Sequence, residues 1–323
     1  MHPFAYHRAE SLADAVRQLA DPASAAPLGG GTDLLVLIGE GLSRPDVLVD
    51  LRRLPRARGV TVESNGDVRI GSATRVAELA RDPVVAERFP ALAQACESVG
   101  TPALRNMGTI GGNLCQRPRC WYFRRRIPCH KNGGDSCPAV DGANQYLAIL
   151  GGGPCYIVHP SDPAVALTAL DARVEITGGA GSRWVGIADF YLLPGQRLDH
   201  ETILGPGEFV SAIQLPEASA GGAQSYVKLM QREAWDFALV SLAAAKRRDG
   251  DVRLVLGGVA PRPWRVTSSV EEDVSTGGLD GDAIDTLADR ALLDVAPLSK
   301  NGYKVSLAGV LLRRAIAELG GEG

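Results

Sequence analysis

The chain of 323 residues carries 34 basic and 37 acidic residues, which leaves a formal net charge of -3. This slight acidic excess argues against charge-driven binding to nucleic acid or to an anionic membrane surface. Hydrophobic residues make up 45% of the sequence, enough for the cores of two or three domains, and no apolar stretch reaches membrane-spanning length. We therefore expect no nucleic-acid partner and no membrane insertion.

The N-terminal part of the sequence predicts a small βαβ-like unit. Helical spacing of apolar residues begins at Leu12, and a short strand is expected near 25–28. The run Gly29-Gly30-Gly31 then leads into a helix over 32–39. A further strand over 46–51 completes the unit.

The next part of the sequence predicts a hairpin followed by helices. Apolar and polar residues alternate over 60–63 and 67–70, on either side of the turn pair Asn65-Gly66. Helices are expected over 74–99, and a short one over 101–108, where proline follows a threonine cap.

Regular structure is expected to resume after a loop rich in proline, glycine and arginine. We predict a strand at 155–158, a helix after Ser161, and strands over 173–177 and 209–215. The composition of 217–222 is that of a linker. Beyond it we predict three strands and two amphipathic helices, at 225–231, 237–245, 252–259, 283–293 and 302–319.

Two glycine-rich runs have the composition of diphosphate-binding loops. Gly29-Gly30-Gly31 lies between a predicted strand and helix, and Thr109 to Asn113 contains the second run. Successive glycines can direct several backbone N–H groups toward one anion. Each run alone is equally consistent with a tight turn, and the first lacks the Rossmann fingerprint because Leu34 replaces its third glycine.

Four of the six cysteines lie in the basic, loop-like segment that follows the second glycine run. No Cys-x-x-Cys pair occurs among them, which disfavours a structural zinc site, whereas wide spacing with basic residues between suits a cubane iron–sulfur cluster. Cys115 and His130 remain alternative ligands, and Cys96 is expected to be a buried core residue. The four candidate ligands are Cys120, Cys129, Cys137 and Cys155.

Several of these segments together resemble a known family. The segments 28–34 and 109–114, the pair Ser161-Asp162 and the residues from Lys228 to Ala238 resemble the FAD-binding medium subunit of the molybdenum hydroxylases, which include xanthine dehydrogenase and carbon monoxide dehydrogenase. The cysteine segment resembles the branch with a [4Fe-4S] cluster in its flavin subunit, as in bacterial aldehyde oxidoreductase.

The resemblance implies an α+β fold. A vanillyl-alcohol-oxidase-like, PCMH-type FAD-binding domain would cover 1–218, with subdomains over about 1–56 and 57–218 and a [4Fe-4S] insertion over about 114–155. A small α+β domain of the carbon monoxide dehydrogenase flavoprotein type would cover 219–323.

The resemblance also implies FAD and one [4Fe-4S] cluster as cofactors, with the four cysteines as cluster ligands and no catalytic residue on this chain. Asp162 would meet ribityl or ribose hydroxyls, and Lys228 would lie near the isoalloxazine. Tyr191 is a candidate to cover the flavin ring, or equally a core aromatic residue. The diphosphate would be held by Leu28, Gly29, Gly30, Gly31, Thr32, Asp33, Leu34, Thr109, Gly111, Gly112 and Asn113.

The implied role is electron transfer within a complex. A molybdopterin-binding large subunit and a [2Fe-2S] small subunit would be the partners, and the terminal electron acceptor is not identified. Two alternatives stay open: a zinc-stapled flavin subunit without a cluster, and a self-sufficient FAD-dependent dehydrogenase. We expect a cytoplasmic location, with the periplasm as the alternative if a signal-bearing partner is exported with this subunit.

Overall fold

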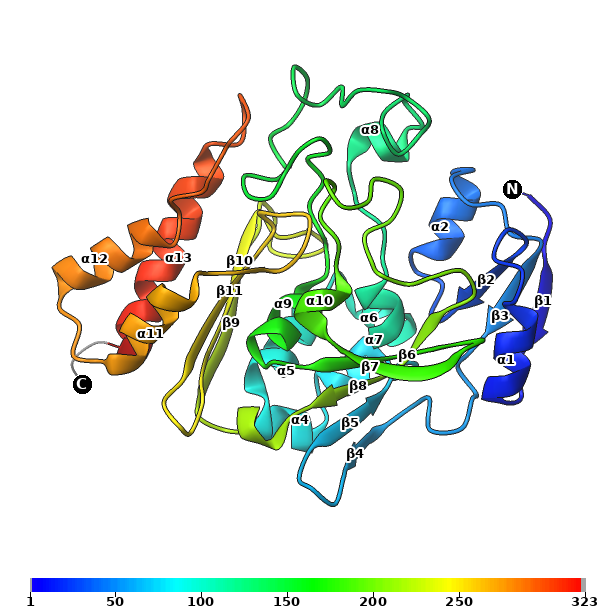
Figure 1. The fold of residues 1–323 in the computed structure, drawn as a ribbon, viewed down its shortest axis with the longest axis horizontal. Helices are drawn as coiled ribbons and strands as arrows, with labels where there is room; N and C mark the ends of the chain where they lie inside the picture. The colour runs from blue at the N-terminus through cyan, green and yellow to red at the C-terminus, as the bar shows by residue number, and fades with distance from the viewer. Residues whose placement is uncertain (1, 321–323) are drawn as a thin grey trace.

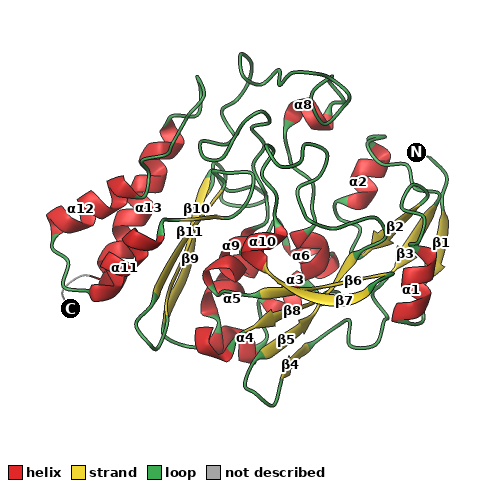
Figure 2. Cartoon of the chain, viewed as in Figure 1, coloured by secondary structure: helices red, strands yellow, loops and turns green. Residues whose placement is uncertain are grey.

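The computed structural model describes residues 2–320, which form three β-sheets and their covering helices (Figures 1 and 2). The sheets follow one another along the chain, so each contains strands from one continuous part of the sequence. No helix in this part of the chain is both long and apolar enough to span a bilayer. The predicted domain limits at 218 and 219 remain a prediction.

The first sheet is parallel and has the order β1-β3-β2. Strand β3 (Val47–Asp50) lies between β1 (Ala5–Arg8) and β2 (Ala25–Leu28), and its last three residues are buried. Helices α1 (Leu12–Gln18) and α2 (Leu34–Gly39) connect the strands. The predicted βαβ-like unit is thus confirmed.

The second sheet has the order β4-β5-β8-β6-β7, and all of its pairs are antiparallel. The hairpin of β4 and β5 turns at Gly66, whose φ of 86° belongs to the left-handed region that glycine adopts freely. The sequence patterns did not predict β7. The strands are β4 (Val60–Val62), β5 (Val68–Gly71), β6 (Arg173–Gly178), β7 (Gly181–Gly186) and β8 (Phe209–Leu215).

Short helices separate the second sheet from the third (Figure 1). The helical region predicted over 74–99 is divided because Pro83 and Pro90 each begin a new helix. Proline has no backbone N–H to donate, so a helix tolerates it in the first turn and not in the interior. These helices are α3 (Val76–Leu79), α4 (Pro83–Arg88), α5 (Pro90–Glu97), α6 (Pro102–Met107), α7 (Ile110–Leu114), α9 (Asp162–Ala169) and α10 (Ile187–Phe190).

The third sheet is antiparallel and has the order β12-β11-β10-β9. One of its faces contacts α5 and α9, and the other is covered by helices of the C-terminal part of the chain. A short 3-10 helix, Glu217–Ser219, precedes the sheet. Its elements are β9 (Ala223–Leu229), β10 (Val240–Lys246), β11 (Val252–Gly257), β12 (Trp264–Arg265), α11 (Ser268–Thr276), α12 (Gly281–Arg290) and α13 (Tyr303–Gly320).

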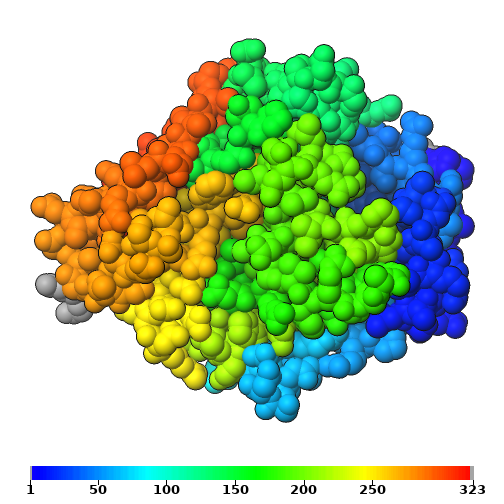
Figure 3. All heavy atoms as spheres, viewed as in Figure 1, coloured from blue at the N-terminus to red at the C-terminus, as the bar shows by residue number. Residues whose placement is uncertain are grey.

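The cysteine segment, 114–155, is mostly irregular and contains only the short helix α8 (Trp121–Arg124). It forms one edge of the molecule between the N-terminal unit and the start of α13 (Figure 3). The strand predicted at 155–158 is wrong. Its backbone hydrogen bonds go to loops instead, since Tyr156 O accepts from Ala148 N at 3.0 Å and the following His159 N donates to Ala260 O at 3.0 Å.

Candidate functional site

The two glycine runs lie in direct contact, although 78 residues separate Gly31 from Thr109 in the sequence numbering. A Cβ atom on Gly30 would stand 1.9 Å from Met107 O, and one on Gly29 would stand 2.5 Å from Thr109 Oγ1. Any larger residue at these positions would push the loops apart. The close approach of the two loops therefore depends on glycine at these positions. This approach places both glycine runs in one site.

The second loop is held by a helix cap and a hydrogen bond to a third segment. Thr109 Oγ1 accepts from Gly112 N at 3.3 Å at the start of α7. Asn113 Oδ1 accepts from Ser161 Oγ at 2.5 Å. Gly111 is buried, and a Cβ there would stand 2.8 Å from Ser72 Cβ, whereas Gly112 is exposed. Of these two glycines, Gly112 presents its backbone to the site.

A small cavity of about 100 Å3 opens where the loops meet, and we call it the loop cavity. Its wall combines residues of the two glycine loops with the carboxylate of Asp162 on α9, the ammonium group of Lys228 on β9, and apolar and aromatic side chains. Its lining includes Thr32, Asp33, Gly108, Thr109, Gly112, Asn113, Asp162, Lys228, Trp235 and Phe237.

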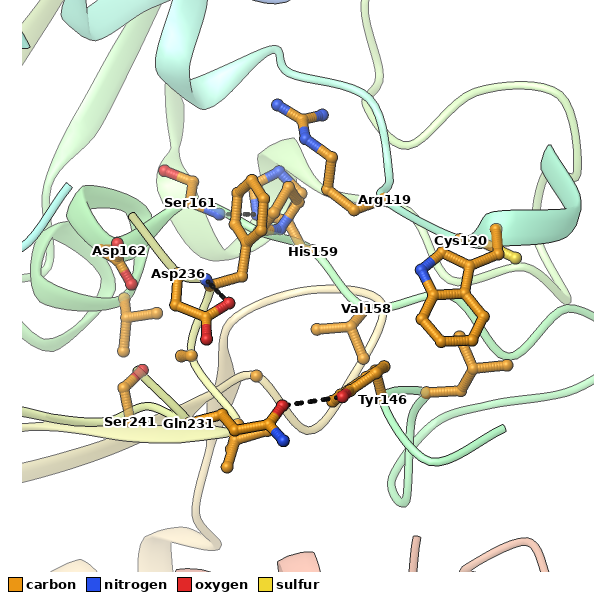
Figure 4. A pocket seen from close by; sticks show the side chains of 18 of the residues that line it. Arg119, Cys120, Tyr146, Val158, His159, Ser161, Asp162, Gln231, Asp236 and Ser241 are labelled. Carbon is orange, nitrogen blue, oxygen red and sulfur yellow. Dashed lines mark hydrogen bonds between the residues drawn. The ribbon is translucent and has the colours of Figure 1, made fainter. Parts of the chain in front are cut away.

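A larger cavity of about 310 Å3 adjoins it, and we call it the aromatic cavity. Arg119 and Cys120 lie on one side and Asp162 and Ser241 on the other (Figure 4). Rings and apolar side chains supply most of the remaining wall, among them Trp121, Tyr122, Tyr146, Val158 and Phe237. The two cavities share Arg119, Pro160, Asp162, Asp236 and Phe237, so together they form one continuous cleft.

A buried ion pair lies in the wall between the cavities. Asp162 Oδ2 accepts from Lys228 Nζ at 2.8 Å, and Oδ1 accepts from Tyr226 OH at 2.7 Å. Burial raises the pKa of the Asp162 carboxyl, while the charge of Lys228 acts in the opposite direction. Lys228 Nζ also donates to Ser98 O at 3.1 Å. The structure thus brings both predicted residues to the cleft, already joined to each other.

Asp33 binds the cysteine segment. Its carboxylate accepts from Arg117 N at 2.8 Å, forms an ion pair with Arg119 at 2.9 Å, and accepts from Arg124 at 2.8 Å. These contacts hold the basic segment against the first glycine loop. Asp33 therefore links the first glycine loop to the cysteine segment, and it also lines the loop cavity.

The proposed role of Tyr191 as a cover for the flavin ring is not supported by its position. Its side chain is 2% exposed, its OH donates to Leu114 O at 3.2 Å, and its ring contacts Phe190 and His159. Tyr191 lines neither cavity. The alternative interpretation as a core aromatic residue accounts for these contacts, because a fully buried phenol needs its hydrogen-bond partner inside the protein.

His159 is buried in the wall of the aromatic cavity, and burial lowers its pKa to about 3. The imidazole is therefore neutral at physiological pH. Its Nε2 atom has no hydrogen-bond partner among the residues that the structure describes. A neutral ring with one unsatisfied nitrogen offers a polar contact to a cleft ligand.

Sequence reasoning missed two aromatic residues of the site. Trp235 and Phe237 belong to the loop between β9 and β10, are 66% and 45% exposed, and line the loop cavity. Arg119 lies over the Phe237 ring, 5.0 Å from its centroid. The signal was available, since two aromatic residues beside Asp236 in an exposed turn have no core to fill.

The four candidate cluster ligands are free thiols, and the charge of some of them would affect the pKa of others. Burial raises the pKa of Cys120, and negative charge on Cys137 or Cys129 would raise it further. Burial raises the pKa of Cys155 to about 11, Lys131 opposes this, and Cys137 and Cys120 add to it. Cys115 shows no such effect, because burial alone raises its pKa to about 12.

The donor chemistry of these thiols fits a cluster, although their arrangement is not that of a closed ligand set. Within residues 2–320, no group of three or more His, Cys, Asp or Glu side chains is placed to hold a metal ion. Cys129 and Cys155 are buried, and Cys120 and Cys137 are partly exposed. Lys131 and the nearby arginines supply positive charge.

Comparison with known families identifies the site. Residues 2–218 match the FAD binding domain in molybdopterin dehydrogenase, and residues 225–319 match the CO dehydrogenase flavoprotein C-terminal domain. The chain belongs to this family of molybdopterin dehydrogenase flavoproteins. It is an oxidoreductase subunit, and its fold is the PCMH-type FAD-binding domain with the flavoprotein C-terminal domain.

Relatives of this flavoprotein family match over nearly their whole length. The chain is 36% identical to the aldehyde oxidoreductase FAD-binding subunit PaoB of Escherichia coli, covering 98% of each chain. It is 31% identical to the putative xanthine dehydrogenase FAD-binding subunit XdhB of the same organism, covering 97% of this chain and 94% of the relative. A chain of carbon monoxide dehydrogenase from Hydrogenophaga pseudoflava is similar with a TM-score of 0.75 and 26% identity, covering 98% of this chain and 97% of that one.

The cleft fits the FAD that the family binds. Gly108 and Gly112 line one end of the cleft, beside the first glycine loop, and aromatic walls with an unsatisfied His159 nitrogen lie at the other. A dinucleotide with a charged diphosphate and a flat, largely apolar ring needs these two kinds of surroundings. The contact of each predicted residue with the cofactor stays a prediction.

Proposed function

We propose that the chain is the FAD and [4Fe-4S] electron-transfer subunit of a molybdenum-dependent complex of the aldehyde oxidoreductase or xanthine dehydrogenase type. It would pass electrons from a molybdopterin-binding large subunit and a [2Fe-2S] small subunit to a terminal acceptor. The observation that carries the proposal is the position of Cys120, which lines the aromatic cavity next to Arg119. A cluster on Cys120 would lie beside a flavin ring in that cavity.

The residues of the chain would bind and orient the cofactor. The two glycine loops would hold the diphosphate with backbone N–H groups, and Gly112 would allow its close approach. The aromatic cavity would take the ring and exclude water from it. FAD supplies the redox chemistry when bound, and the protein contributes the binding and orientation of the cofactor.

Three observations support the cluster ligands: the thiols are free, they are at least partly buried, and the charge of Lys131 acts on Cys155. Positive neighbours favour thiolates and offset the negative charge of a cubane. The relatives named as aldehyde oxidoreductase and xanthine dehydrogenase subunits support the assignment to such a complex.

The protein purified without oxygen is expected to contain FAD together with about four irons and four acid-labile sulfides per flavin, as one cubane requires. The visible spectrum should show flavin bands above a broad shoulder of iron–sulfur absorbance. Metal analysis and sulfide assay give the counts. Zinc without sulfide would reject the cluster and keep the FAD subunit, and a protein without flavin would reject the proposed function as a whole.

A further inference from the structure

Lys304, in the first turn of α13, is a buried cation behind the wall of the aromatic cavity. The residue is only 1% exposed. Its Nζ atom donates to Tyr146 O at 2.9 Å and to Gly258 O at 2.7 Å. Tyr146 and Gly258 both line the aromatic cavity. The ammonium group is thus separated from the cavity by one layer of backbone.

This positive charge has no counter-charge in the part of the chain that the structure describes, because Lys304 forms no ion pair with any carboxylate there. Burial lowers the pKa of Lys304 to about 7, and no charged neighbour opposes that effect, so the charged ammonium form predominates only below that pH. The other buried cations of the site differ, since Lys228 pairs with Asp162 and Lys131 pairs with Glu201. A buried charge without a partner is costly, so its presence needs a reason.

The need to hold α13 against the cysteine segment does not explain why a lysine is buried here. Neutral Asn301 already joins the same two segments, because its Nδ2 atom donates to Leu147 O and Ala148 O, each at 3.1 Å. Asn144 adds a further link, since its Oδ1 atom accepts from Lys300 N at 2.9 Å. Amide side chains therefore suffice to tie the start of α13 to the end of the cysteine segment.

We propose that Lys304 provides the positive charge that favours the reduced, anionic form of a flavin in the aromatic cavity over its oxidised form. The inference rests on the proposed function, because it requires FAD in this cleft. In surroundings of low dielectric constant, the electrostatic effect of a cation extends over several ångströms. Within residues 2–320, no carboxylate forms an ion pair with Lys304 that would offset this effect. Lys304 would thus raise the midpoint potential of the flavin without touching it.

The test is a reductive titration of the full chain with its bound FAD at about pH 6, where a group with a pKa of about 7 is mostly protonated, using redox dyes to read the flavin midpoint potential. In Lys304→Met we expect the potential to fall, with the ratio of reduced to oxidised FAD dissociation constants rising about tenfold or more, or about 30 mV for a two-electron couple. Lys304→Arg keeps the charge and is expected to keep most of the potential. Should Lys304→Met fail to fold, Lys304→Gln removes the same charge.

Lys246, the last residue of β10, provides a control because its side chain binds the same helix, α13. Its Nζ atom donates to Leu319 O at 2.8 Å, at the opposite end of α13 from Lys304. Lys246→Met removes a comparable link between a lysine and a carbonyl, and it should leave the flavin potential unchanged. An unchanged potential in Lys304→Met, or equal shifts in both variants, would overturn the inference. A wild-type chain without FAD would instead overturn the proposed function.

Discussion

Replacing Cys137 by serine is expected to remove the iron and acid-labile sulfide of the protein while most of the FAD remains bound. Cys137 is one of the four proposed ligands, and its charge would affect the pKa of both Cys120 and Cys155. A cubane needs a thiolate on each iron, and serine is a poor substitute. Iron should fall from about four to below about one per flavin. Metal analysis and the loss of the broad visible shoulder measure the effect.

Cys115 is the control for this substitution. It lies at the C-terminal end of α7 in the same part of the chain, but burial alone raises its pKa and no other cysteine contributes. Cys115→Ser is therefore expected to retain its iron and sulfide. If Cys115→Ser loses the cluster and Cys137→Ser keeps it, the ligand assignment is wrong and Cys115 replaces Cys137.

Substitution of Gly112 by valine is expected to weaken FAD binding at least about a hundredfold, equivalent to about 2.7 kcal/mol. A Cβ atom on Gly112 meets only Thr109 Oγ1, at 3.1 Å, so the fold accommodates it if the Thr109 side chain shifts by a few tenths of an ångström. The side chain would project from an exposed backbone into the loop cavity, where the diphosphate must approach the N–H groups. Titration of the apoprotein with FAD, followed by flavin fluorescence, gives the dissociation constant.

Gly179 provides the control for the Gly112→Val substitution. A Cβ atom on Gly179 would meet no atom within 4 Å, and this residue lies far from the loops in sequence, so Gly179→Val should bind FAD like the wild type. Gly111→Val is less informative, because its side chain would collide with Ser72 inside the protein. Wild-type affinity in a folded Gly112→Val variant would show that the diphosphate does not lie at this loop.

Local sequence signals predicted those parts of the fold that depend on local geometry. Asn65-Gly66 marked the hairpin of β4 and β5 because only a few residues adopt the backbone of such a turn. The three helices within 74–99 were predicted as one region because apolar spacing does not show how proline divides it. The strand predicted at 155–158 failed because a short apolar run does not reveal whether a neighbouring strand exists.

The sequence predicted the separate loops of the candidate site, but it did not predict the contacts that bring these loops together. The glycine runs identified the loops, but their contact at Gly30 and Met107 is a long-range feature without a local signal. Asp33 appeared as a loop residue, whereas its arginine partners follow more than 80 residues later. For Tyr191 the sequence left a core position and a cofactor contact equally open, and its buried side chain favours the core position.

The most direct test of the electron-transfer role is rapid anaerobic mixing of an aldehyde with the isolated subunit and with the assembled complex, followed by absorbance of the flavin. We expect no flavin bleaching in the isolated subunit and complete bleaching in the complex, because the organic substrate would react on the large subunit. Bleaching of the isolated subunit by the aldehyde would contradict the electron-transfer role and identify the chain as a self-sufficient flavin dehydrogenase.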